Sequence, residues 1–106
     1  MSYRFMRVIV FFDLPTTTKN ERREYNSFRK HLIKNGFIMM QESVYSKLAL
    51  NQNAAAIICD NVKKHKPPAG IVQMLTITEK QFSKMEMIVG KISSNVVSTD
   101  ERIVVI

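Results

Sequence analysis

The stretch that decides the fold is Arg4-Phe-Met-Arg-Val-Ile-Val-Phe-Phe-Asp13. Seven of its ten residues are apolar, and valine, isoleucine and phenylalanine dominate, which is typical of a strand buried on both faces. Pro15 follows shortly afterwards and cannot continue a central strand, because it lacks the N–H that a sheet ladder needs. Side chains alternate along a strand, so Asp13 shares its face with Ile9 and Phe11. We therefore predict a carboxylate at the tip of an otherwise apolar sheet face.

Length and composition indicate one folded domain. With 106 residues, of which 45% are hydrophobic, the chain is long enough for one core and too apolar for disorder. Its single cysteine, Cys59, excludes an intramolecular disulfide and suits the reducing cytoplasm. No apolar run reaches the roughly 18 to 20 residues of a membrane span, and the N-terminus lacks the pattern of a signal peptide. We expect a cytoplasmic protein with no membrane partner.

The charge balance is strongly basic. Sixteen Lys and Arg against nine Asp and Glu give a net charge of +7. Such an excess on a small domain favours a polyanionic partner, most often nucleic acid. The alternative, that the charge only aids solubility, stays open because net charge does not identify a partner.

The rest of the chain alternates between helical and extended patterns. Thr18 and Glu21 have the spacing of a capping box, which marks a helix start. The elements predicted after the first strand are, in order, a helix over 18–35, two strands within 37–50 that turn near Glu42-Ser43, a helix over 54–64 capped by Asn51 or Asn53, a strand over 71–78, a short helical turn around Phe82, and brief strands over 85–89 and 102–106. This order predicts an α+β fold of ferredoxin-like βαββαβ topology, an antiparallel sheet with two helices on one face.

Two helices cannot cover both faces of such a sheet. The apolar residues of the strands are too many for one covered face, so a symmetric partner is the simplest cover, and we expect a homodimer. We assign residues 1–90 to the ferredoxin-like core. Residues 91–106 form a C-terminal tail whose last strand has no slot in a four-stranded sheet, and we expect it to pack on the partner subunit.

The first helix has a basic face. Tyr25 and Phe28 recur with Leu32 on one side, and a stripe of cations lies on the other side, formed by Arg23, Lys30 and Lys34. Lysines also cluster at the end of the second helix, at Lys63, Lys64 and Lys66. Two explanations of this lysine cluster are equally good. The lysines stabilise the negative end of the helix dipole, or they bind phosphate. His31 and His65 are interpreted as exposed helical histidines.

Asp13 is the one candidate for chemistry. The sequence has no phosphate-binding glycine loop and no Cys/His spacing for zinc. A symmetric dimer would supply two Asp13 carboxylates, which repel unless a proton or cation lies between them. Mg²⁺ suits one or two carboxylates with substrate phosphates, and it would polarise a phosphodiester and lower the pKa of an attacking water. The alternative is that Asp13 only caps the turn at residues 16–18.

At this point the residues resemble a known family. Four segments together look like the CRISPR-associated protein two family, in the version found in type II systems: Phe12-Asp13 at the end of the first strand, Lys34-Asn35-Gly36-Phe37, Gln41-Glu-Ser43-Val44-Tyr45, and Leu75-Thr76-Ile77-Thr78. The resemblance covers nearly the whole chain. It implies a ferredoxin-like homodimer with metal-dependent endonuclease activity on RNA or DNA. It also implies a role with the CRISPR integrase in acquiring new spacers.

The resemblance also implies roles for individual residues. Asp13 matches the catalytic, metal-binding acid of the family. The segment near the dimer face is matched by Phe12, Ser43 and Tyr45. Arg22 and Arg23 lie roughly where the family carries basic residues after the acid, and together with Lys30 and Lys34 of the basic stripe they are the predicted nucleic-acid-binding residues. The family often has tyrosine before the aspartate, so Phe12 lacks the hydroxyl with which that tyrosine would position a water or a phosphate.

Three functions follow from these observations. The first is an Mg²⁺-dependent phosphodiesterase built across a dimer axis by Asp13. The second is a structural adaptor, in which the basic helices hold double-stranded DNA while the dimer joins integrase assemblies and Asp13 does no chemistry. The third is a generic ferredoxin-like module for single-stranded RNA, which the absence of a glycine-containing aromatic motif disfavours.

Overall fold

The computed structural model of the protein describes residues 5–90, and both the predicted tail over 91–106 and its strand over 102–106 lie outside these residues. The elements are β1 (Met6–Asp13), α1 (Lys19–Lys34), β2 (Ile38–Gln41), β3 (Val44–Ala49), α2 (Gln52–Lys64), β4 (Ile71–Thr78) and α3 (Glu79–Phe82). The predicted α+β class and the βαββαβ order are therefore confirmed. So is the turn at Glu42-Ser43, which separates β2 from β3.

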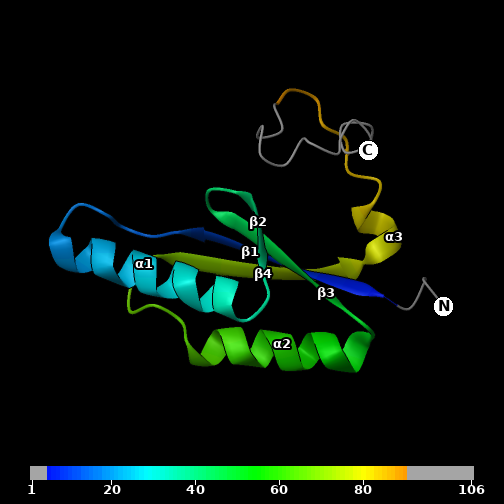
Figure 1. Ribbon diagram of the computed structural model, residues 1–106, viewed down its shortest axis with the longest axis horizontal. Helices are drawn as coiled ribbons and strands as arrows, with labels where there is room; N and C mark the ends of the chain where they lie inside the picture. Colours follow the sequence, from blue (N-terminus) through cyan, green and yellow to red (C-terminus); the bar gives the residue numbers. More distant parts are fainter. Residues whose placement is uncertain (1–4, 91–106) are drawn as a thin grey trace.

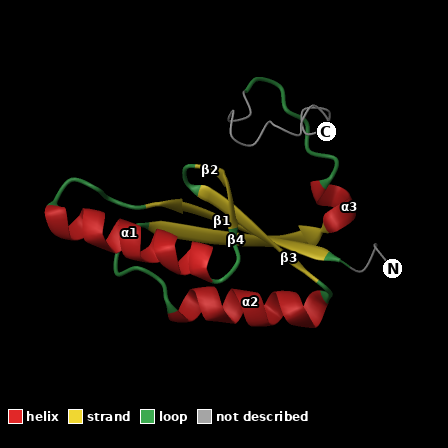
Figure 2. Cartoon of the chain, viewed as in Figure 1, coloured by secondary structure: helices red, strands yellow, loops and turns green. Residues whose placement is uncertain are grey.

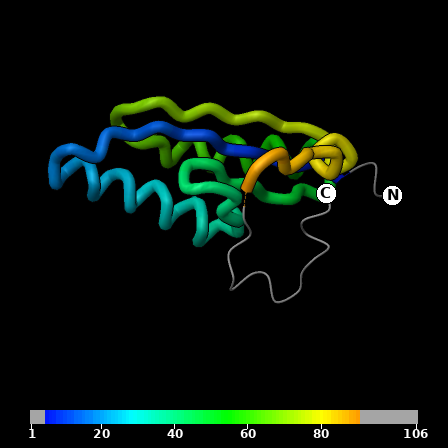
Figure 3. Tube along the Cα trace, turned by 90° about the horizontal axis from the view of Figure 1, so that it is seen from above, coloured from blue at the N-terminus to red at the C-terminus, as the bar shows by residue number. Residues whose placement is uncertain are grey.

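The four strands form one antiparallel sheet in the order β2-β3-β1-β4. β1 is central and pairs with β4 along its whole length, from Met6 opposite Thr78 to Asp13 opposite Ile71 (Figure 3). α1 and α2 lie together on one side of this sheet, whereas α3 rises on the other side (Figures 1 and 2). β1 is thus the strand around which the remaining elements are arranged.

The hydrophobic core fills the space between the sheet and the two long helices. Val8 and Val10 of β1 are fully buried there, with Leu32 of α1. Phe12 is 5.2 Å from Phe28 between ring centroids, in an edge-on arrangement. The alternation of β1 thus places its even-numbered residues in the core, as the sequence predicts.

The opposite face of the sheet remains largely uncovered among the described residues. Its exposed apolar side chains come from all four strands and are Phe11, Ile38, Leu48, Ile71 and Leu75. We call this set the open apolar face. Contiguous apolar surface of this kind marks an interaction site.

An ion pair closes one end of the open apolar face. Arg7 of β1 donates from Nε and Nη2 to the two carboxylate oxygens of Glu79, at 2.8 and 2.5 Å. The guanidinium also lies 4.4 Å from the ring centroid of Phe82. These contacts hold α3 against the start of β1, at the opposite end of the strand from Asp13.

The helix ends follow the predicted local signals. Thr18 and Glu21 form a capping box at the start of α1, and Asn51 caps α2. Gly36 follows α1 with φ of 92°, a conformation that glycine adopts without the steric penalty of a Cβ atom. Lys47 of β3 reaches across and donates from Nζ to the carbonyl oxygen of Asn35 at 2.6 Å. This bond ties the C-terminal end of α1 to the sheet.

One predicted element is wrong. Residues 85–89 form no strand, and the chain there runs through turns and irregular structure instead. The N–H of Met85 bonds back to the carbonyl of Phe82, so α3 turns the chain away from the edge of β4. Without a neighbouring strand, β propensity alone does not form a ladder. No described helix is long and apolar enough to cross a membrane.

Candidate functional site

Asp13 lies at the exposed tip of β1, on the sheet face that also carries Phe11. Its neighbour across the sheet is Ile71 of β4. Among residues 5–90 its carboxylate takes part in no hydrogen bond and no ion pair, so all of its acceptor sites remain free. A carboxylate at the tip of an apolar sheet face is the arrangement that the sequence predicts, and the structure adds that this carboxylate has no partner among the described residues.

The backbone around this tip is held closely. The N–H of Phe12 donates to the carbonyl of Ser43 at 3.1 Å, which brings the β2–β3 turn beside β1. On the other side, Gly70 has φ of 95°, and a Cβ there would lie 2.9 Å from the carbonyl oxygen of Asp13. Only glycine allows this approach, so β4 starts directly against Asp13 and fixes where its side chain projects.

The alternative role for Asp13, as a cap of the following turn, finds no support. The N–H groups of Thr17 and Thr18 both donate to Oε1 of Glu21, each at 3.0 Å. Arg22 donates from Nη1 to the carbonyls of Thr16 and Thr17, at 3.2 and 2.9 Å. Glu21 and Arg22 therefore hold this loop, and the carboxylate of Asp13 takes no part in these bonds.

Asp13 is the candidate metal ligand at this tip. In the part of the chain that the structure describes, no group of three or more His, Cys, Asp or Glu residues lies close enough to hold a metal ion. Asp13 alone offers two oxygen atoms, which suits a hard cation such as Mg²⁺ that takes one or two carboxylates and keeps several waters. The donor chemistry fits such an ion, and the number of ligands fits a site completed by a second copy.

The structure does not bring all of the predicted neighbours of Asp13 together with it. Phe12 and Tyr45 lie on the helix-covered face, where their rings stack with centroids 5.6 Å apart. Ser43 lies in the turn beside β1 and is half-buried. A tyrosine in place of Phe12 would therefore direct its hydroxyl toward the core, away from the face that carries Asp13.

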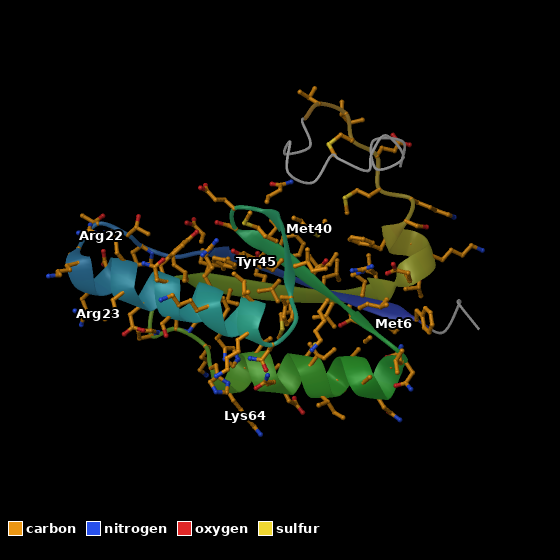
Figure 4. The ribbon with its side chains drawn as sticks, in the orientation of Figure 1. Met6, Arg22, Arg23, Met40, Tyr45 and Lys64 are labelled. Atoms are coloured by element: carbon orange, nitrogen blue, oxygen red, sulfur yellow. The ribbon has the colours of Figure 1, made fainter. Side chains whose placement is uncertain are left out.

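The predicted basic stripe lies on the outer face of α1. Figure 4 shows Arg22 and Arg23 projecting from the first turns of this helix. A shallow open hollow of about 550 Å³ runs along it and is lined by Lys19, Arg22, Arg23, Asn26, Ser27 and Lys30. Lys34 continues the same face one turn further on and is exposed. We call this surface the α1 basic face; it points away from the sheet, so it does not compete with the open apolar face.

The two histidines of the chain contact each other, which the sequence did not predict. The rings of His31 and His65 stack with centroids 3.9 Å apart and planes inclined by 24°. His31 is half-buried and is thus not the freely exposed side chain that was expected. Nothing in the local pattern could have shown this contact, because it joins the C-terminal ends of two different helices.

The α+β fold with its antiparallel sheet agrees with the comparison to known sequences. The sequence model of the family described as "CRISPR associated protein Cas2" matches residues 6–85. This range includes every described helix and strand. The chain belongs to the Cas2 family.

Several curated Cas2 proteins are similar over almost their full length. One from Treponema denticola is 55% identical over 101 residues, covering 95% of this chain and 100% of that protein. One from Streptococcus mutans is 44% identical over 99 residues, covering 93% and 91%. One from Ligilactobacillus salivarius is 41% identical over 101 residues, covering 95% and 100%. Each of these three proteins is named CRISPR-associated endoribonuclease Cas2, so the predicted family is confirmed.

Proposed function

We propose that this Cas2-family protein is a homodimeric, divalent-metal-dependent endonuclease in which Asp13 of each copy holds a shared Mg²⁺ ion. The observation that carries the proposal is the uncommitted carboxylate of Asp13 at the tip of the open apolar face. Pairing of two such faces would bury apolar side chains and place two acids at one interface. The names of the similar proteins favour RNA as the substrate.

In this mechanism the residues of the site bind the cation or position the residue that binds it. Asp13 and its copy would bind the cation through carboxylate oxygens, and Gly70 and Ser43 would fix the backbone on both sides of the acid. When bound, the ion supplies polarisation of the phosphodiester and a lower pKa for the attacking water. No histidine lies at the tip of β1, because the two histidines of the chain lie on α1 (His31) and directly after α2 (His65). A protein general base is therefore not part of this proposal.

A second function is supported by a separate observation, the α1 basic face. Its cations line an elongated surface on the side of α1 away from the sheet. Such a surface suits the phosphate backbone of double-stranded DNA, which is bound largely by lysine and arginine. We propose that the dimer also serves as a DNA-binding scaffold that works with the CRISPR integrase in spacer acquisition. The two functions use different faces and can coexist in one dimer.

The test of the nuclease function is Asp13→Asn. This change keeps the size of the side chain and removes the charge that the cation requires. We expect cleavage of labelled single-stranded RNA in Mg²⁺ to fall by more than about 100-fold. We also expect titration calorimetry with Mn²⁺ to show loss of metal binding, while affinity for double-stranded DNA stays within about twofold, since the α1 basic face is untouched.

The matched control is Asp60→Asn, which removes an exposed carboxylate on α2. This variant should cleave RNA like the wild type. Equal cleavage by Asp13→Asn and the wild type would refute the proposed role of Asp13, and absence of cleavage by the wild type would leave the DNA scaffold as the role of the protein. Cleavage that persists in excess EDTA would refute the dependence on metal.

A further inference from the structure

His31 and His65 join the ends of the two long helices. His31 lies in the last turn of α1 and His65 follows the last residue of α2. Their rings are 3.9 Å apart between centroids and nearly parallel. These are the two histidines of the chain, so every imidazole of the protein is in this one contact.

A network of amides fixes the orientation of both rings. The Nδ1 atom of His65 is 3.0 Å from the carbonyl of Asn61, which only accepts, so Nδ1 carries the hydrogen and Nε2 remains to take up a further proton. Asn61 donates from Nδ2 to Oδ1 of Asn35 at 3.2 Å. Nδ2 of Asn35 donates to the carbonyl of His31 at 2.8 Å and lies 3.3 Å from its Nδ1. The stack is therefore built into the junction of the helices.

The charged groups around the stack are cationic. Lys34 faces it from α1, and Lys47 reaches from β3 to the carbonyl of Asn35. The end of α2 adds lysines in its last turn and just beyond it, at Lys63, Lys64 and Lys66. Figure 4 shows Lys64 projecting away from the sheet at this end of α2. Asp60 is the nearest carboxylate in the sequence of α2, and within residues 5–90 it makes no ion pair with either ring or with these lysines.

Proton uptake by His31 is unfavourable in the free protein. A charge on the ring of His65 repels a charge on His31 at this distance, and Lys34 adds to that repulsion. Burial, together with His65 and Lys34, lowers the pKa of His31 below its ordinary 6.5. A histidine with a lowered folded pKa binds fewer protons than in the unfolded chain, so the fold is weakened as the pH falls through 6.5. A bound anion beside the two rings would oppose the lowering of the pKa of His31 and the weakening of the fold at low pH.

We propose that His31 and His65, with Lys34 and Lys64, form a second phosphate-binding site whose occupation is coupled to proton uptake. The ligand is a phosphodiester of double-stranded DNA, and the proposal rests on the DNA-binding function proposed above. An oxygen of the phosphate accepts from protonated Nε2 of His65, and its negative charge allows both rings to be charged.

The position of the site favours DNA over a small anion. Lys34 belongs both to the α1 basic face and to this cluster, so the two surfaces are continuous. From Lys19 to Lys34 the helix extends about 22 Å, at 1.5 Å per residue. That length equals roughly six to seven base pairs at 3.4 Å per pair. A DNA strand that follows α1 from its first turn therefore arrives at the stacked histidines.

The experiment measures protons taken up when the full-length protein binds a short DNA duplex. Calorimetry at pH 6.3 in buffers of different ionisation enthalpy gives this number directly. We expect about one proton per protein chain for the wild type and close to none for His31→Gln/His65→Gln. We also expect wild-type affinity at fixed salt to rise about tenfold from pH 7.5 to pH 6.0, against less than about twofold for the variant, because each linked proton changes affinity with pH.

Two comparisons separate this inference from the function on which it rests. The single variant His65→Gln keeps His31 and tests whether the second ring is needed. This variant should lose most of the proton uptake. Arg23→Glu/Lys30→Glu removes cations of the α1 basic face and should weaken binding at every pH without changing the shape of the pH dependence. NMR titration of the histidines without DNA should show a lowered pKa for His31 in the wild type, because burial is the main cause. In His65→Gln this pKa should rise but stay below its ordinary value, and that partial rise would confirm that the two rings are coupled.

The outcomes are distinct. Duplex binding by the wild type with no proton uptake, or with equal uptake in the variant that lacks both histidines, overturns the phosphate site alone. A wild type that fails to bind duplex at low salt overturns the proposed DNA-binding function and this inference with it. Inorganic phosphate at micromolar concentration is added in place of DNA. If it causes the same proton uptake, the ligand of the site is the free anion and not DNA.

Discussion

At the scale of single residues, Tyr45 matches a residue of the family but does not lie at the site around Asp13. Its side chain is fully buried in the core, and its hydroxyl has no hydrogen-bond partner among the described residues. Figure 4 places it on β3, facing α1 and α2. A buried hydroxyl without a partner costs about 1 to 3 kcal/mol of desolvation, so its presence weakens the fold.

We therefore predict that Tyr45→Phe leaves RNA cleavage unchanged and does not lower stability. The free energy of unfolding in urea should be unchanged or higher by up to about 2 kcal/mol, because the unpaired group is removed without leaving a cavity. Tyr25→Phe is the matched control: its hydroxyl donates to the carbonyl of Glu42 at 3.4 Å, and its loss should lower stability by about 0.5 kcal/mol. Loss of cleavage in a folded Tyr45→Phe protein would show that this hydroxyl takes part in the chemistry.

Residue-level prediction from the sequence succeeded where the cause is local. The exposed position of Asp13 follows from alternation along one strand, and the cap at Thr18 follows from its spacing to Glu21. The stacked histidines were missed because His31 and His65 are each adjacent to ordinary helical residues. Their contact depends on how two helices cross, and no pattern within either helix contains that information.

At the scale of elements, α1 separates two tasks on its two sides. Phe28 and Leu32 bury one side in the core, and the α1 basic face occupies the other. Changes on the outer side should therefore alter binding without altering the fold. The pattern of the sequence was sufficient to predict this division, since a helix of 16 residues displays its period of 3.6 several times.

The α1 basic face predicts a measurable salt dependence of DNA binding. For Arg23→Glu/Lys30→Glu, the slope of log affinity against log salt should decrease by up to about 1.8, since each lost phosphate contact contributes roughly 0.9. The control is Lys80→Glu/Lys84→Glu, which changes net charge equally at exposed positions on and after α3. Equal effects from both variants would mean that only overall charge matters, and an unchanged slope for the first would exclude this face from DNA contact.

Short extended segments were the hardest elements to predict. The turn at Glu42-Ser43 was placed correctly although it contains no glycine or proline, because a single strand over 37–50 would be too long. The strand expected over 85–89 is absent because its β-forming residues have no neighbour to pair with. Strand formation depends on a partner elsewhere in the chain, so composition alone overpredicts it.

At the scale of the whole molecule, the two long helices α1 and α2 and the open apolar face lie on opposite sides of one sheet. This layered arrangement follows from the order of elements, and it was predictable once the first strand was recognised as central. We propose that a second molecule covers the open apolar face. The sequence indicates that a partner is needed, and the proposed partner is another copy of the chain.

The last prediction tests that partner. Leu75 is half-exposed near the middle of the open apolar face, opposite Ile9 of β1. Leu75→Glu would place a charge in the interface, so it should convert a dimer into a monomer in analytical ultracentrifugation at micromolar concentration. RNA cleavage should be lost with the dimer, because one Asp13 cannot complete the metal site. Ile57→Glu introduces the same charge at an exposed position on α2 and should leave both properties intact. A wild type that is monomeric under these conditions, or a monomeric Leu75→Glu protein that still cleaves, would refute a site shared between two copies.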